Sequence, residues 1–253
     1  MSSVWLTRLK SVAAATAMLA VWQVVCATDW VSPLLLASPF AIARWLATCL
    51  FEPAVWSDLF ASVLRVLIAL LISTLIGIPT GMLLGRFRAL EQLLRFPIDF
   101  GRSIPATALF PLFILFFGAR EGSRVAAAIY GAALIILMNT MVGVRQANAM
   151  RMRAARAYGA TGWKLYVYVL LPEALPAMIA GIRLGASLSL VIIVLVEMFV
   201  GTSSGLGHRI INSQIMYEIP EMYGTIIITG TLGYAINLVF VVIEQRFAHY
   251  VGH

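Results

Sequence analysis

The chain has 253 residues, of which 61% are hydrophobic and only 11% are charged. Its mean hydropathy of +0.94 leaves too few polar residues to cover a soluble fold of this size, so the composition predicts an integral membrane protein. The formal net charge of +7 does not indicate nucleic-acid binding, because no motif of interleaved basic and aromatic residues accompanies it.

Six long apolar segments follow one another, each near the ~17–25 residues that cross a hydrocarbon core of roughly 30 Å. Five contain no Asp, Glu, Lys or Arg, and the remaining one contains only Arg183 and Glu197. The six expected spans are Ser11–Thr28, Val66–Gly85, Ser103–Ala119, Val125–Val144, Ala174–Val200 and Met222–Ile243. They predict an all-α polytopic membrane protein with a single transmembrane domain over residues 1–253.

The first segment has features of a cleavable signal, since Arg8 and Lys10 precede an apolar run that ends in small residues. We interpret it as a membrane helix, because the run is slightly long for a signal and its removal would leave five spans. Cys26 and Cys49 could both lie toward the outer side, where a disulfide is chemically possible. We favour two unpaired residues, and their spacing fits no metal site.

Residues 29–58 form an expected outer connection rich in Trp and Pro, which are typical of a membrane interface. A short helix around Pro39–Leu50 lying along the membrane surface fits this segment, and a plain loop fits it nearly as well.

Small residues recur at four-residue spacing in two of the spans. They are Gly77, Gly81 and Gly85 in the second span, and Ala177, Gly181, Gly185 and Ser189 in the fifth. Such a stripe lets a second helix backbone approach closely, so we expect helix contacts here and no ligand site.

Three prolines, Pro97, Pro105 and Pro111, precede or interrupt the third span. A membrane helix broken by proline must bury its freed backbone groups in protein or turn them toward a wet cavity. The segment Ser103–Phe117 is therefore a candidate wall of a translocation path, and a kinked Phe-rich packing helix is the alternative. The residues expected on that wall are Ser103, Pro105, Phe110 and Phe113.

Basic residues concentrate on one side if the N-terminus lies inside, because the inner segments then hold twelve of the eighteen Lys and Arg residues. These are Arg8, Lys10, Arg86, Arg88, Arg95, Arg102, Arg145, Arg151, Arg153, Arg156, Lys164 and Arg246. The outer segments hold only Arg44, Arg120, Arg124 and Arg209, with Arg65 and Arg183 near helix ends. The distribution predicts cytoplasmic termini.

No catalytic constellation is present in the sequence. Gly159–Lys164 reads G-A-T-G-W-K and lacks the spacing and the Ser or Thr of a phosphate loop, and the three histidines do not cluster. We therefore expect no enzyme, no metal site and no cofactor in this chain.

Glu197 is the one serious candidate for a functional acid inside a span. It lies about 34 Å along the fifth helix from Ala174, near the outer interface, where gating, helix tethering or simple solvation would each fit. Arg183 lies about 14 Å along the same helix and could snorkel inward, pair with an acid on a neighbouring helix or face the pathway.

A polar segment between the fourth and fifth spans reads Arg153-Ala-Ala-Arg-Ala-Tyr-Gly159 and is followed by Val169-Leu-Leu-Pro172. A short Ala-rich helix that ends at a glycine predicts a docking surface for a soluble partner. The spacing resembles the signature E-A-A-x(3)-G-x(9)-I-x-L-P of permease subunits of bacterial ATP-binding-cassette (ABC) importers. Arg153 stands where the signature has Glu.

Further blocks in the same order extend the resemblance over residues 57–246, to the nitrate, sulfonate and taurine branch of these permeases. They include Leu64-Arg-Val-Leu, Gly77-Ile-Pro-Thr-Gly-Met-Leu-Leu-Gly85-Arg, Ser103-Ile-Pro, Phe110-Pro-Leu-Phe-Ile-Leu-Phe-Phe-Gly118, Asn139-Thr-Met-Val-Gly-Val144, Ala180-Gly-Ile-Arg-Leu-Gly185, Val196-Glu-Met198 and Ser203-Ser-Gly-Leu-Gly207.

The resemblance implies the six-helix type I ABC importer permease fold with a cytoplasmic coupling helix, in the bacterial inner membrane. It implies a second permease copy, most simply in a homodimer, and two cytoplasmic ATPase subunits that bind ATP and Mg. It also implies a periplasmic solute-binding protein that delivers a small solute, most often an anion such as a sulfonate, taurine, nitrate or an aromatic carboxylate. A self-sufficient ion-coupled carrier and a membrane scaffold are the alternatives.

The implied site residues fall into two groups. Coupling to the ATPase is expected at Arg153, Ala154, Ala155, Arg156, Gly159 and Pro172. A translocation path or gate is expected at Ser103, Pro105, Phe110, Phe113, Glu197, Ser203 and Ser204. Because an Arg replaces the usual acid at position 153, either the partner ATPase carries a compensating acid or the contact has moved to Arg151 and Arg156.

Overall fold

The computed structural model describes residues 2–28, 30–199 and 203–251, which form helices joined by short connections, with no strand among them. Four helical segments in this part of the chain are long and apolar enough to cross a membrane, namely Pro53–Arg86, Glu121–Arg145, Gly162–Phe199 and Ile219–Arg246. A bent helix pair adds a fifth if it forms one span. The predicted all-α polytopic fold class is confirmed.

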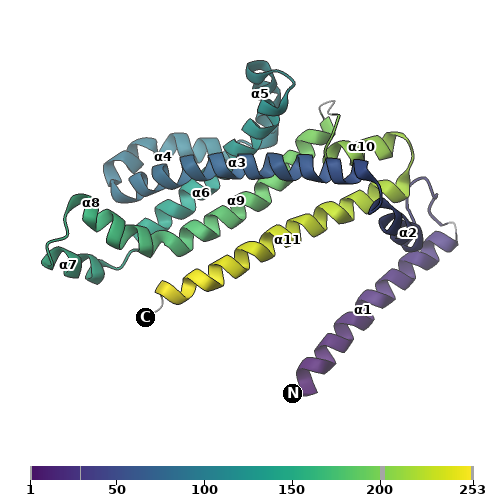
Figure 1. The fold of residues 1–253 in the computed structure, drawn as a ribbon, viewed down its shortest axis with the longest axis horizontal. Helices are drawn as coiled ribbons and strands as arrows, with labels where there is room; N and C mark the ends of the chain where they lie inside the picture. Colours follow the sequence, from purple (N-terminus) through teal and green to yellow (C-terminus); the bar gives the residue numbers. More distant parts are fainter. Residues whose placement is uncertain (1, 29, 200–202, 252–253) are drawn as a thin grey trace.

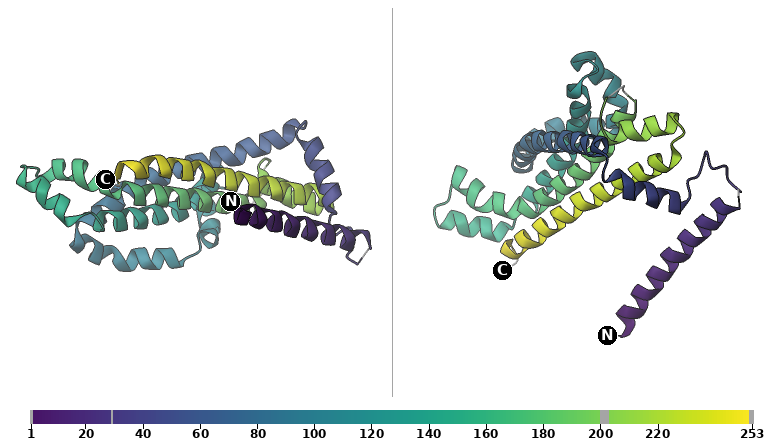
Figure 2. Two further views of the ribbon diagram at one scale, coloured as in Figure 1. Left: turned by 90° about the horizontal axis from the view of Figure 1, so that it is seen from below. Right: turned by 45° about the vertical axis from the view of Figure 1, so that its right-hand side comes forward.

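Helix α6 (Glu121–Arg145) packs along both α3 (Pro53–Arg86) and α9 (Leu171–Phe199) and forms the centre of the bundle. Helix α11 (Ile219–Val251) lies beside α9 (Figure 1). Helix α1 (Ser2–Ala27) lies apart from the bundle along most of its length, as Figure 1 and the right-hand view of Figure 2 show. The expected span end at Val200 lies outside the described residues.

Close helix approach in the bundle depends on glycine. A Cβ added at Gly81 would lie 2.5 Å from the Leu137 carbonyl oxygen, and one at Gly181 would lie 2.8 Å from Asn139 Cβ. Gly77, Gly85 and Gly185 also lie against α6. The small residues of α3 and α9 thus contact α6 from its two sides, where dispersion and backbone proximity hold membrane helices together.

The expected third span, Ser103–Ala119, is wrong as a single helix. Helix α4 (Arg88–Ser103) follows α3 and ends just before Pro105, and the short helices η1 (Ala106–Leu109) and α5 (Phe110–Phe117) leave it at an angle of 88°. Ile104 is extended (φ −86°, ψ 120°) because the residue before a proline avoids the helical region. Arg95 and Arg102, predicted in a connection, lie instead on α4.

The helix expected around Pro39–Leu50 is present as α2 (Pro39–Cys49), which Ser38 caps by accepting a hydrogen bond from the Ala41 amide at 3.2 Å. It packs on α11, where the Trp45 ring lies so close to Gly224 that no larger residue fits. Cys26 and Cys49 are both free thiols.

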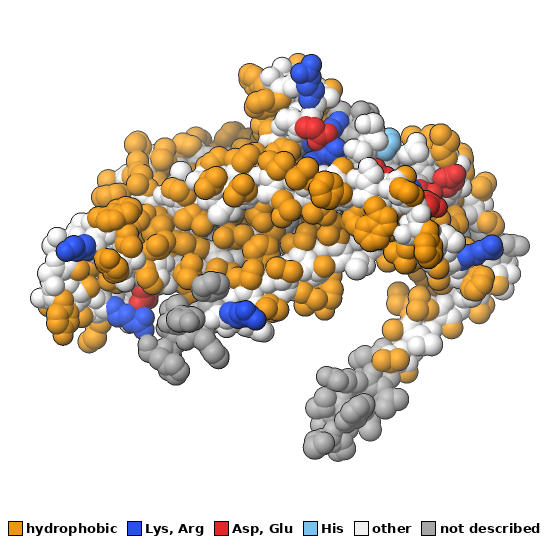
Figure 3. Space-filling view, in the orientation of Figure 1, with side chains coloured by type: hydrophobic (Ala, Val, Ile, Leu, Met, Phe, Trp, Pro, Cys, Tyr) orange, Lys and Arg blue, Asp and Glu red, His pale blue; other side chains and the backbone are white. Residues whose placement is uncertain are grey.

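At the opposite end of the bundle, α7 (Ala149–Ala157) is followed by α8 (Gly162–Leu165) and by a π-helical turn, η2 (Tyr166–Leu170), that runs into α9. On the face drawn in Figure 3, hydrophobic side chains cover the middle of the bundle and most charged side chains lie toward its ends. This distribution is the one that a membrane imposes.

Candidate functional site

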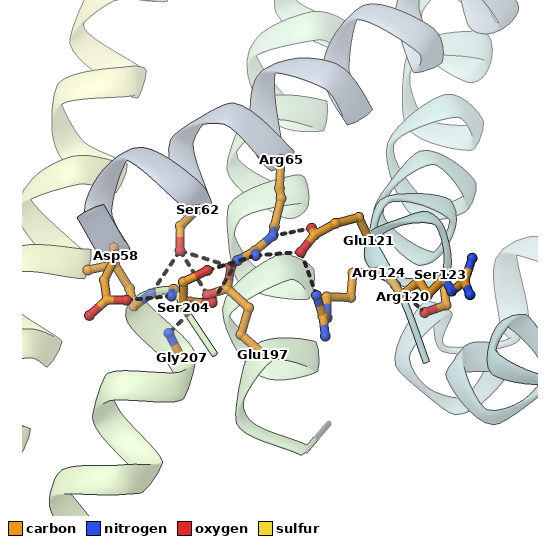
Figure 4. A network of polar contacts seen from close by, with 12 residues as sticks. Asp58, Ser62, Arg65, Arg120, Glu121, Ser123, Arg124, Glu197, Ser204 and Gly207 are labelled. Carbon is orange, nitrogen blue, oxygen red and sulfur yellow. Dashed lines mark hydrogen bonds and ion pairs between the residues drawn. The ribbon is translucent and has the colours of Figure 1, made fainter. Parts of the chain in front are cut away.

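A buried carboxylate, Glu197, organises the end of the bundle opposite α7 (Figure 4). It is 1% exposed and accepts hydrogen bonds from Arg65 Nη1 at 2.5 Å, from the Ser62 hydroxyl at 2.8 Å and from the Gly207 amide at 3.0 Å. Three donors for one carboxylate satisfy a charge that would otherwise be costly to bury. Glu197 therefore joins α9 to α3 and to the start of α10 (Leu206–Ile215).

The turn that precedes α10 is fitted closely around this ion pair. Arg65 Nη1 also donates to the Ser204 carbonyl oxygen at 3.0 Å, and the Gly205 amide donates to Asp58 Oδ1 at 2.8 Å. Gly205 has φ +127°, and a Cβ there would lie 2.5 Å from the Glu197 carboxyl carbon. Only glycine both adopts this φ angle without strain and leaves room for the Glu197 carboxylate. Ser204 thus takes part in the network, whereas Ser203 is exposed.

Further ion pairs extend the network to the other helices. Arg65 Nε and Nη2 donate to the two oxygens of Glu121 at 2.5 and 2.8 Å, and Arg124 Nη1 donates to Glu121 at 2.7 Å. Toward α10 and α11, Arg209 donates to Asp58 at 2.8 Å and to Glu221 at 2.5 Å. We call this set the polar cluster; it comprises Asp58, Ser62, Arg65, Glu121, Arg124, Glu197, Ser204, Arg209 and Glu221.

The cluster ties together the ends of α3, α6, α9, α10 and α11, and its charges nearly balance. Arg209 lies on α10, outside the membrane-spanning segments, and burial by itself lowers the pKa of its guanidinium. The hydrogen bonds and charges of Asp58 and Glu221 outweigh burial, so the pKa stays above the usual value. Arg209 is therefore a permanent cation.

Sequence reasoning identified Glu197 and Ser204 but assigned no role to Arg65, Asp58, Glu121 or Arg209. These residues are far apart along the chain and each resembles an ordinary charge near a helix end. The one local signal was the Ser-Ser-Gly-Leu-Gly turn, whose glycines imply close approach to a neighbouring group.

The second predicted site, on α7, is exposed at the other end of the bundle. Asn148 caps the helix by accepting hydrogen bonds from the Met150 and Arg151 amides at 2.8 and 3.4 Å. Beyond the helix, Gly159 has φ +82°, and the amides of Gly159 and Ala160 donate to Arg156 O and Ala155 O, both at 2.9 Å. This pair of bonds is the Schellman pattern that a glycine permits.

Most of the predicted coupling residues are exposed at this end of the bundle. Arg153, Ala154, Arg156, Gly159 and Pro172 are exposed and Ala155 is half-buried. The opposite face of α7 is anchored, because Met152 packs with Met82, Val144 and Leu170 and because Arg151 Nη1 donates to Glu173 at 2.7 Å.

The four residues predicted on the translocation wall have different surroundings, although Phe110 and Phe113 belong to the same hydrophobic cluster. Phe110 is buried in the core with Val66 and Ala127, and Phe113 packs 6.4 Å from the Tyr130 ring. The Ser103 hydroxyl donates to the Asp99 carbonyl oxygen at 2.9 Å within its own helix. Pro105, in contrast, lines a cavity of about 480 Å³ at the helix break.

Arg183 pairs with Glu244 of α11 at 2.8 Å, which is one of the three arrangements expected for it. In the described residues no group of three or more His, Cys, Asp or Glu side chains could hold a metal ion.

The chain resembles known transport proteins in both sequence and fold. The family model described as "Binding-protein-dependent transport system inner membrane component" matches residues 73–251. The taurine transport system permease protein TauC of Escherichia coli is 26% identical over 96% of this chain and 90% of its own length. The putative aliphatic sulfonates transport permease protein SsuC of the same organism is 29% identical over 90% of this chain and 87% of its own.

Among solved structures, the inward-facing MetNI methionine ABC transporter matches with a TM-score of 0.65 and 23% identity, covering 78% of this chain and 98% of the matched chain. An amino acid ABC transporter with histidines matches with a TM-score of 0.61 and 20% identity, covering 81% of this chain and 98% of that one. These likenesses show the fold.

Proposed function

Because the chain belongs to the family of binding-protein-dependent transport system inner membrane components, and is an ABC importer permease of the taurine and sulfonate type, we propose that it forms the solute path of an ATP-driven importer. It is a multi-pass membrane protein and a transport component of such a system. The proposed solute is a small organic or inorganic anion, and a periplasmic binding protein delivers it.

The observation that carries the proposal is the exposed face of α7. Small side chains at Ala154 and Ala155 allow close approach of a partner, and the basic side chains of Arg153 and Arg156 flank them. Such a surface fits a soluble partner protein that covers it. We assign that role to a cytoplasmic ABC ATPase, which supplies the sites for ATP and Mg.

One α7 per chain means that two chains are needed to engage two ATPase subunits. The proposed assembly is therefore a homodimer of this chain with two ATPases, in the bacterial inner membrane and with both termini in the cytoplasm. The positive-inside rule supports that orientation, since α7 with its arginines then faces the cytoplasm.

The proposed mechanism follows from how α7 is connected. Met152 and the Arg151–Glu173 pair attach α7 to the start of α9, and α9 is one helix of 29 residues that carries Glu197 near its far end. Closure of the ATPase dimer would displace α7, tilt α9 and strain the polar cluster, in which Glu197 and Ser204 hold α3 and α10 together. Opening and closing of that cluster would gate the path on the periplasmic side.

The first experiment is purification of the tagged chain from native membranes in mild detergent, with mass spectrometry of co-purifying proteins. We expect a near-stoichiometric subunit that carries a phosphate loop, and ATP-dependent solute uptake after reconstitution with the binding protein. Recovery of the chain alone in several gentle detergents, with uptake driven by an ion gradient, would support a secondary carrier and refute the importer.

A further inference from the structure

Helix α4 carries a stripe of charged side chains that the rest of the chain does not cover. Arg95, Asp99 and Arg102 lie three or four residues apart on one face, and their side chains are 73%, 55% and 49% exposed. None of the residues of α4 is buried. In a soluble protein such a face would simply be a solvated surface.

The depth of the stripe makes it unusual. Along α3, Arg65 and Arg86 are about 31 Å apart at about 1.5 Å per residue, which matches a hydrocarbon core of roughly 30 Å. Helix α4 turns back from the Arg86 end, and the Tyr130 hydroxyl donates to the Gly101 carbonyl oxygen at 2.7 Å. Tyr130 lies about 22 Å along α6 from Arg145, whose level marks the same end of the bundle. Because Arg145 also pairs with Glu91 of α4 at 3.0 Å, Arg95 lies about 6–12 Å and Arg102 about 16–22 Å into the membrane.

Charged side chains at this depth are costly against lipid and occur where they line a water-filled cavity or meet a partner. The stripe has one acid for two arginines, and Asp99 lies 3.8 Å from Arg95 and 3.7 Å from Arg102. These distances exceed those of charge-assisted hydrogen bonds. The stripe keeps a net positive charge and donors that are free to bind an anion.

A cavity of about 480 Å³ opens beside the stripe at the Pro105 break. Arg102 is the one charged residue in its lining, and Leu134, Leu188, Val191 and Ile192 form much of the opposite wall. Its volume is typical of small-molecule sites. The cavity therefore combines one cationic group at its edge with largely apolar walls.

We propose that Arg102 and this cavity form a binding site within the membrane for an organic anion that carries an apolar group, such as an alkyl or aryl sulfonate or carboxylate. The guanidinium binds the anionic head through paired hydrogen bonds, and the apolar walls take the hydrocarbon. Inorganic anions and zwitterions leave the apolar walls unused. The permease itself then selects its solute by charge and hydrophobicity. This inference rests on the proposed function and adds a site to it.

Equilibrium dialysis of the purified permease–ATPase complex with radiolabelled hexanesulfonate tests the proposal, with empty micelles as the blank. We expect saturable binding of hexanesulfonate, and competition that is weak for methanesulfonate, hexylammonium and hexanol. Arg102→Gln should weaken binding at least tenfold, and Arg102→Lys should restore part of it. Asp99→Asn should strengthen binding several-fold, because it removes the competing acid. The matched control Arg88→Gln, at the end of α4 that lies away from the cavity, should stay within twofold of wild type.

A second variant, Leu134→Trp, fills the cavity without a change of charge and should also abolish binding. The proposal is overturned if the wild-type complex shows no saturable binding, if hexylammonium or hexanol competes as well as unlabelled hexanesulfonate does, or if Arg102→Gln binds like wild type. If the stripe instead held two copies of the chain together, the Arg102→Gln variant would dissociate into single copies, and each copy would bind hexanesulfonate as the wild type does. Failure of the importer itself would appear separately, as loss of the co-purifying ATPase or of ATP-dependent uptake.

Discussion

Replacement of Arg65 by methionine would test whether the polar cluster stabilises the bundle. Met keeps the apolar stem of the side chain but removes the donors that Glu197, Glu121 and Ser204 share. The Glu197 side chain, which is fully buried, would retain only Ser62 and the Gly207 amide. Removal of one partner of a buried ion pair costs about 3–5 kcal/mol, which corresponds to a shift of roughly 10²–10⁴ in the unfolding equilibrium.

The assay is denaturation of the purified chain in mixed micelles, followed by circular dichroism, with the free energy of unfolding compared between variants. The matched control is Arg151→Met, which breaks an ion pair of 2.7 Å whose arginine is half exposed. Pairs of that kind contribute about 1 kcal/mol or less. We expect the Arg65 variant to lose several times more stability than this control.

A double variant makes the test sharper. Arg65→Met with Glu197→Leu removes both charges, so it should recover most of the stability that the single change loses, because no unpaired charge remains buried. A loss below about 1 kcal/mol in the single variant would refute the reasoning, since the pair would then behave as a surface salt bridge. A double variant no more stable than the single one would also refute it.

Three further changes address the turn and the α7 surface. Gly205→Ala should destabilise the chain by about 1–2 kcal/mol or more in thermal unfolding, because φ +127° disfavours any Cβ and the new atom would meet the Glu197 carboxylate. The control is Gly230→Ala, where no atom lies within 4 Å of the added Cβ. Gly159→Val should abolish solute-stimulated ATP hydrolysis in the reconstituted complex, because a β-branched residue is strained at φ +82° and distorts the turn after α7. The loss in melting temperature should be small, because this turn is exposed and nothing lies within 4 Å of the new Cβ. Gly159→Asn should retain coupling, because Asn tolerates this backbone conformation, and equal activity of both variants would argue against the turn's role. Arg153→Glu should reduce stimulated ATP hydrolysis with the native ATPase, and unchanged stimulation would rule out a complementary acid on the partner.

Several properties of this protein could be predicted from the sequence because they depend on local composition. Uncharged runs are long enough to cross a membrane only as helices, so the fold class followed directly. Glycines four residues apart implied close contacts, and α3 and α9 do meet α6 there. The exposed helix with its glycine stop also followed from local rules, since α7 and its cap involve only neighbouring residues.

The helix break at Pro105 could be predicted only in part from the local sequence. Pro105 predicted an interruption, but a helix in the residues before it was missed, because their charges suggested a connection outside the membrane. The amphipathic spacing of Arg95, Asp99 and Arg102 was the available signal.

The sequence by itself determined that this chain is a helical membrane protein with a polar docking segment, since hydropathy and helix caps act over a few residues. Only the tertiary structure decided which charges meet. Glu197 lies far along the chain from Arg65, and its burial depends on how α3, α9 and the turn before α10 pack together. The energy of a buried charge is set by its partners in space, and no local pattern records them.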